Sequence, residues 1–191
     1  NSPVSVAVGD IAGDGKLDVN TASVGDVVSV LRNISSSGSV SLAAKVDFST
    51  GSGATPQTVA VGDVDGDGKI DVAVGNNVGN TVSVFRNSSS VGSITSGSLA
   101  AKVDFAGAIG GGPFGIALND IDGDGKPEIT VANQNTGSLS VMKNLAPLFE
   151  SEPNDSASVA MLIAYGDTLD GAISPRTDRD YYKFVAALND T

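Results

Sequence analysis

The sequence contains no histidine and no cysteine. Histidine is the commonest general base in enzymes, and without it a Ser-His-Asp triad cannot be assembled. Without cysteine the chain can form no disulfide bond and offers no thiolate nucleophile. We therefore expect that the protein is not an enzyme, although a carboxylate pair for glycoside hydrolysis stays open because acidic residues are plentiful.

Basic residues and long apolar runs are also scarce. Only 11 Lys and Arg stand against 22 Asp and Glu, and no basic stripe is present to neutralise the phosphates of a nucleic acid. No stretch approaches the roughly 20 apolar residues of a membrane-spanning helix. We expect neither a nucleic-acid partner nor a membrane span. The chain begins within a strand-like pattern and without Met, which indicates a mature or excised fragment.

Aromatic residues make up only 5% of the chain, and its apolar content rests on Val, Ala, Leu and Ile. With 24 glycines and abundant Ser and Thr, this composition favours an all-β protein with many turns. The 191 residues can hold one large domain or two small ones.

The most informative stretch is an acidic run at 63–71, with carboxylates at positions 1, 3, 5 and 9 and glycines at positions 4 and 6. The run recurs at 10–18 and 120–128. The three runs hold 11 of the 22 acidic residues, whereas a halophile-like surface would scatter them. Carboxylates that converge in a tight turn repel one another unless a cation lies between them. Oxygen ligands in an irregular loop suit Ca²⁺, so we expect up to three calcium ions.

Two well-known calcium motifs do not fit the acidic runs. An EF-hand needs Glu at position 12 of its loop, where this chain has Thr21, Val74 and Val131. The nonapeptide repeat of calcium-binding β-helices is absent. An Asp/Gly hairpin that binds no metal is the remaining alternative.

Three repeats organise most of the chain. The acidic runs begin 53 and 57 residues apart, and an Asn recurs at 33, 87 and 144. The second unit shows strand-like patterns at 58–62, 70–75, 81–86 and 99–105, with counterparts in the first unit at 4–8, 17–22, 27–32 and 42–48. The third unit has three such patterns, at 114–118, 129–132 and 138–143, and stops after Asn144.

Four antiparallel strands in about 55 residues, repeated, predict β-propeller blades, since a β-sandwich would not repeat loop and turn so regularly. Three blades cannot close a ring, so either upstream blades or another copy must complete it. We assign 1–149 to blades (about 1–55, 56–112 and 113–149) and 150–191 to a linker and a truncated further domain.

The stretch 56–74 resembles the FG-GAP/VCBS repeat of integrin α-subunit propellers and of many bacterial surface and secreted proteins, and Phe114-Gly115 matches its FG element. The resemblance implies that each loop binds Ca²⁺ through side chains at positions 1, 3, 5 and 9 and the carbonyl at position 7. Carried over, the expected ligands are Asp63, Asp65, Asp67, the Lys69 carbonyl and Asp71; Asp120, Asp122, Asp124, the Lys126 carbonyl and Glu128; and Asp10, Asp14, the Lys16 carbonyl and Asp18.

The first and third loops depart from the family pattern. Ala12 removes the position-3 carboxylate of the first loop, which should weaken that site. Glu128, behind Pro127, replaces the usual Asp in the third loop, and its longer side chain can shift the positions of the calcium ligands. We expect calcium affinity to fall in the order second, third, first.

The tail, from Glu152-Pro153-Asn154-Asp155 to Asp178-Arg179-Asp180-Tyr181-Tyr182, resembles the start of the bacterial pre-peptidase C-terminal (PPC) domain, a β-sandwich. A disordered tail is the alternative. About 40 residues are too few for a core of their own, so we expect a truncated domain. The resemblance implies a secreted, prokaryotic protein.

These resemblances imply an extracellular or cell-surface calcium-binding β-propeller module that binds a protein or glycan, with adhesion as one form of that role. The alternative is an accessory or partial propeller domain of a secreted polysaccharide-degrading enzyme or peptidase. The ligand itself cannot be inferred from these residues.

Overall fold

A computed structural model describes residues 2–106 and 111–145, together with four short strands further along the chain. The chain divides into two compact units, of which the first holds residues 1–64 and 68–144. The second holds residues 65–67 and 145–191. No helix among the described residues is long and apolar enough to cross a membrane.

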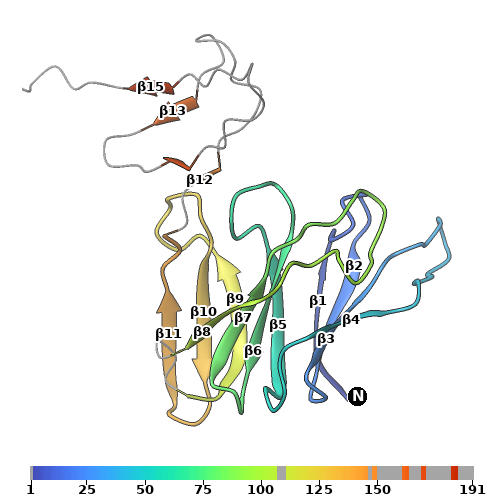
Figure 1. Cartoon of the computed structure of the whole chain (residues 1–191), viewed down its shortest axis with the longest axis horizontal. Helices are drawn as coiled ribbons and strands as arrows, with labels where there is room; N and C mark the ends of the chain where they lie inside the picture. Colours follow the sequence, from blue (N-terminus) through green and yellow to red (C-terminus); the bar gives the residue numbers. More distant parts are fainter. Residues whose placement is uncertain are drawn as a thin grey trace, which may run out of the picture. The chain divides into compact units, whose positions relative to one another are not determined.

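The first unit consists of three antiparallel sheets in a row (Figure 1), and the expected all-β fold of propeller blades is confirmed. We number the sheets as blades in chain order. The first blade is β1 (Pro3–Gly9), β2 (Asp18–Ser23), β3 (Val27–Leu31) and β4 (Val46–Ser49); the second is β5 (Pro56–Gly62), β6 (Asp71–Asn76), β7 (Thr81–Phe85) and β8 (Val103–Ala106); the third is β9 (Pro113–Asn119), β10 (Glu128–Asn133) and β11 (Ser138–Met142).

Within each blade, neighbouring strands in sequence are neighbours in the sheet. Among the residues that the structure describes, the third blade has three strands, in the order β11-β10-β9, as the missing fourth pattern predicts. The fourth strands of the other two blades begin later than expected. Leu42 and Leu99 form only isolated bridges, to Asn33 and Asn87, before pairing resumes at Val46 and Val103. The backbone N–H of Ser35 bonds the Asn33 side chain, which turns the chain out of the sheet there.

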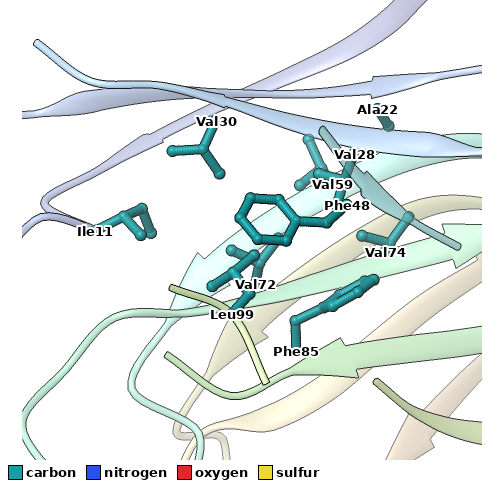
Figure 2. Close-up of a cluster of buried hydrophobic side chains, with 10 residues drawn as sticks. All are labelled: Ile11, Ala22, Val28, Val30, Phe48, Val59, Val72, Val74, Phe85 and Leu99. Carbon is teal, nitrogen blue, oxygen red and sulfur yellow. The ribbon is translucent and has the colours of Figure 1, made fainter. Parts of the chain in front are cut away.

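The main core lies between the first two blades (Figure 2). Val28 and Val30 of β3 are fully buried, as are Val72 and Val74 of β6, and Phe48 packs among them. Every residue of β6 is buried, as expected for a strand enclosed by neighbouring blades. A smaller cluster of Val82, Ile129 and Val131 joins the second and third blades.

The second unit contains two parallel strand pairs, β12 (Leu148–Phe149) with β14 (Leu169–Asp170) and β13 (Met161–Ile163) with β15 (Tyr182–Phe184). Most of the expected linker and truncated PPC-like domain lies outside the described residues, and that assignment stays a prediction.

Candidate metal centre

The three acidic runs form the loops that join the first and second strands of each blade. Both glycines of each loop have positive φ: 64° and 82° at Gly13 and Gly15, 80° and 81° at Gly66 and Gly68, and 80° and 87° at Gly123 and Gly125. This left-handed backbone is easily adopted only by glycine. The pair of glycines therefore sets the path of the loop.

The position-1 carboxylate closes each loop on itself. It accepts a hydrogen bond from the backbone N–H at position 6: Gly15 to Asp10 at 2.7 Å, Gly68 to Asp63 at 2.9 Å, and Gly125 to Asp120 at 2.9 Å. Bonds of this kind between an N–H and a charged oxygen are stronger than neutral ones. They hold the loop in shape and keep the position-1 oxygens at its centre.

The position-9 carboxylate is buried in every blade, with exposed fractions of 0% for Asp18, 1% for Asp71 and 2% for Glu128. One oxygen accepts a bond from the start of the loop, from the N–H of Ala12, Val64 or Ile121 at 2.8, 2.9 and 2.9 Å. The other accepts from the N–H of Asn33, Asn87 or Asn144 at 2.8, 2.8 and 3.4 Å. A buried carboxylate needs such partners, so this residue also ties the loop to the end of the third strand.

Carboxylates converge in the second and third loops. Oxygens of Asp120, Asp122 and Glu128 lie within 4.8 Å of one another, and those of Asp63, Asp65 and Asp71 form a group of the same kind. In the described part of the chain the first loop yields no such group, because Ala12 stands at position 3. Three convergent carboxylates without nitrogen or sulfur fit a hard cation such as Ca²⁺.

Position 5 lies outside both groups. In the first and third loops its carboxylate accepts the backbone N–H at position 7, Lys16 to Asp14 at 3.1 Å and Lys126 to Asp124 at 3.0 Å. Two expectations stay predictions. One is that the position-5 carboxylates, including Asp67, are calcium ligands. The other is that the position-7 carbonyls are ligands, those of Lys16, Lys69 and Lys126.

A basic side chain faces two of the loops, a feature that the repeat pattern did not reveal. Lys143 Nζ lies 2.5 Å from Asp122 Oδ2 and 3.7 Å from Asp124 Oδ2. Hydrogen bonding to Lys143 lowers the pKa of Asp122, and the same bond raises the pKa of Lys143. In the first blade an Arg32 guanidinium nitrogen lies 3.5 Å from Asp14 Oδ2. The available signal was a basic residue directly before each recurring Asn.

The recurring Asn has a structural role that its spacing alone did not reveal. Its Nδ2 donates to the position-8 carbonyl of its own loop: Asn33 to Leu17 at 2.9 Å, Asn87 to Ile70 at 2.9 Å, and Asn144 to Pro127 at 3.2 Å. In the second and third blades it also reaches the position-2 carbonyl of the preceding loop, Ile11 at 2.9 Å and Val64 at 2.7 Å. Consecutive loops are thus linked across the blade boundary.

A family model described as the FG-GAP-like repeat matches residues 10–74 and again residues 63–131. The chain belongs to the FG-GAP-like repeat family. Each match begins at position 1 of one loop and ends within the second strand of the next blade, so the FG-GAP match includes all three loops. The resemblance expected from the sequence is confirmed for the blades, whereas no comparison bears on the PPC-like tail. No curated protein matches the chain. FG-GAP repeats are generally non-catalytic and often bind Ca²⁺.

Proposed function

We propose that this chain is a non-catalytic, extracellular β-propeller module whose loops bind structural Ca²⁺ and whose surface binds a protein or glycan. One observation carries the proposal: Asp120, Asp122 and the buried Glu128 converge within 4.8 Å. Their negative charges repel one another, and a divalent cation is the simplest group that neutralises them.

The residues that would hold the ion are those at positions 1, 3 and 9 of the second and third loops, with position 5 and the position-7 carbonyl completing the set. Bound Ca²⁺ would neutralise the carboxylates. The chain supplies the rest: backbone N–H groups orient the position-1 and position-9 oxygens, and the two glycines allow the tight turn. The ion then stabilises the folded state, since the unfolded loop cannot gather these oxygens.

The proposed order of affinity is second loop, third loop, first loop. The second loop carries the full set of four Asp. In the third loop Glu128, behind Pro127, stands in place of the Asp at position 9, and its longer side chain changes the arrangement of the ligands. The first loop lacks an acid at position 3, so it offers one carboxylate fewer than the second.

An extracellular location agrees with the proposed structural role of Ca²⁺. Calcium sites of extracellular modules bind the ion in the range of roughly 10⁻⁴ to 10⁻³ M. Sites of that strength are filled at the millimolar calcium found outside cells and stay largely empty at cytosolic concentrations. The net charge of −11, concentrated in the loops, adds to the attraction for cations.

Ligand binding is proposed for the Ser- and Gly-rich excursions that follow the third strands of the first two blades. They are loops on a β scaffold, where binding residues concentrate. Val40 is 90% exposed and Val91 is 80% exposed within them. Apolar side chains held in water on polar loops support contact with a partner surface.

Calcium titration by isothermal calorimetry tests the metal part of the proposal. We expect two ions to bind the wild-type chain clearly and a third weakly. Asp63→Asn and Asp120→Asn should each remove one of the two, because Asn keeps an oxygen for the Gly N–H but loses the charge. An absence of Ca²⁺ binding at 10 mM would reject the proposal. A glycan array and a pull-down, each with calcium or EDTA, then test the ligand.

A further inference from the structure

The two boundaries between blades share one packing rule. The side chains of Val61 and Ile70 in the second blade lie over Gly9 of the first, where an added Cβ would meet Val61 Cγ2 at 2.9 Å and Ile70 Cγ2 at 3.2 Å. At the next boundary Leu118 lies over Gly62 in the same way, at 3.2 Å. The first strands of the first and second blades therefore end in a glycine that makes room for the following blade.

One hydrogen bond also recurs at both boundaries, from a backbone N–H of the following blade to a hydroxyl of the preceding blade. The N–H of Val59 donates to Ser5 Oγ at 3.2 Å, and the N–H of Ile116 donates to Thr58 Oγ1 at 3.2 Å. A blade that accepts a neighbour thus carries a hydroxyl four residues before its glycine. A blade that docks on a neighbour presents apolar residues at the positions of Val59 and Val61.

The first blade presents those docking residues to solvent. Val6, Val8 and Leu17 occupy the repeat positions of Val59, Val61 and Ile70, and we call these three the outer face of the first blade. They are 64%, 55% and 59% exposed, whereas Val59 is 5% exposed. Asn33 of the first blade occupies the repeat position of Asn87, whose side chain donates a hydrogen bond to the loop of the preceding blade.

The third blade does not satisfy the rule for accepting a neighbour. It keeps an apolar surface, since Leu139 and Val141 are 67% and 52% exposed at the positions of the buried Val28 and Val30. However, Asn119 stands where Gly9 and Gly62 stand, and Gly115 stands where Ser5 and Thr58 stand. A second copy that placed Val8 over Asn119 would meet its side chain and lack the hydroxyl acceptor.

We propose that the outer face of the first blade is a docking surface for a further blade of the same repeat type, one that carries Ser or Thr at the Ser5 position and glycine at the Gly9 position. The third blade of a second copy is not that occupant. Such docking extends an interface that the chain already forms twice, and it is independent of calcium binding.

The test converts the third blade into the proposed occupant. Asn119→Gly removes the obstructing side chain, and Gly115→Thr adds the hydroxyl; an added Cβ at Gly115 has only an ordinary contact, with Ala132 Cβ at 3.5 Å. Val8→Glu in the same chain disables its own outer face. This triple variant can accept the wild-type first blade but cannot dock on another copy of itself.

We expect wild-type protein and the triple variant each to run as monomers in light scattering, and their mixture at about 50 μM of each to form a 1:1 complex. The Val8→Glu variant of the wild-type chain should not form the complex, whereas Val78→Glu, which puts the same charge on an exposed turn of the second blade, should form it as wild type does. A variant that carries Ala117→Gly in place of Asn119→Gly should also fail to form the complex with wild-type protein.

Two results would overturn the proposal. One is a mixture that stays monomeric while circular dichroism shows the variant folded as wild type. The other is wild-type protein that self-associates and is dispersed by Val8→Glu, which would make a second copy the occupant. If the triple variant does not fold, Asn119→Gly with Val8→Glu alone serves in its place and is expected to bind more weakly.

Discussion

The Nδ2 atom of Asn87 donates a hydrogen bond to the carbonyl of Ile11, 2.9 Å away and 76 residues earlier in the chain. The same side chain donates to the carbonyl of Ile70 at 2.9 Å, and it is only 2% exposed. The side-chain amide of Asn87 thus links the acidic loop of its own blade to the acidic loop of the preceding blade. The two loops are parts of one hydrogen-bonded structure rather than independent hairpins.

Asn87→Ala should therefore destabilise the protein by about 1–3 kcal/mol, because it leaves buried carbonyls short of a donor. The loss at Ile11 is moderated by Ser89 Oγ, which also bonds that carbonyl at 2.7 Å. Asn33→Ala is the matched control, since the Nδ2 bond from Asn33 to Leu17 stays within one blade. Urea unfolding of both variants checks the prediction, and equal losses would show that the link across the boundary contributes nothing.

Lys143 should set the calcium affinity of the third loop. Lys143→Gln removes the ammonium that contacts Asp122 and Asp124, so a cation no longer has to displace it. We expect the affinity of that site to rise about two- to fivefold, in keeping with the modest strength of exposed ion pairs. Terbium luminescence or calorimetry measures the change. Lys45→Gln, which breaks the ion pair with Asp47 away from the loops, should leave the affinity unchanged.

Asp104 should make a pH-dependent contribution to stability. Burial raises its pKa, but hydrogen bonds from Lys102 and Ser83 outweigh this, so the pKa in the folded state is below its ordinary value. A depressed carboxyl pKa stabilises the fold above the unfolded pKa of about 3.9, and this stabilisation is lost as the pH falls through the folded pKa. Asp104→Asn should cost about 0.5 kcal/mol at pH 7, after allowance for solvent screening, and less below pH 4.

Urea unfolding of wild type and Asp104→Asn at pH 7 and pH 3.5 measures this difference. Asn keeps an acceptor for Ser83 Oγ, which donates to Asp104 at 2.6 Å, so the variant mainly removes charge. A difference between the two proteins that does not change with pH would contradict an electrostatic origin.

Gly75 should be intolerant of a side chain, because Thr58 of its own blade and Pro113 of the third blade both lie close to it. An added Cβ would lie 2.5 Å from Thr58 Cγ2 and 3.1 Å from Pro113 Cβ, so Gly75→Ala should cost about 1–3 kcal/mol. Gly97→Ala is the control, because its nearest neighbour is Thr95 Oγ1 at 3.9 Å; it should change stability by less than about 0.5 kcal/mol. Comparable thermal midpoints for the two variants would contradict the packing argument.

Much of this fold could be predicted because local patterns determine it. The alternation of Val72 and Val74 gives a buried strand, and the glycines of each acidic run give a loop with positive φ. The end of the repeat pattern after Asn144 was also visible in the sequence, and the third sheet has three strands in the described part of the chain. Each of these features depends on residues close together in the chain.

Features that depend on contacts between blades could not be predicted in the same way. The spacing of Asn33 and Asn87 marked a repeat, but only the structure shows that Asn87 reaches Ile11. The ion pair of Lys143 with Asp122 joins residues 21 positions apart, and the sequence pattern does not say which carboxylate a flexible lysine contacts. The consequence of Asn119 at the end of β9 likewise follows only from the packing of Val61 over Gly9.

The central claim is that calcium stabilises these blades through the convergent carboxylates, and the thermal midpoint in calcium against EDTA tests it most directly. Ligand at 100 times its Kd adds about 2.7 kcal/mol to a folded state that alone binds it, so we expect Tm to rise by several degrees in 10 mM Ca²⁺. The rise should shrink in Asp63→Asn and in Asp120→Asn and be nearly lost when the two are combined. An identical Tm in 10 mM Ca²⁺ and in excess EDTA would contradict the account.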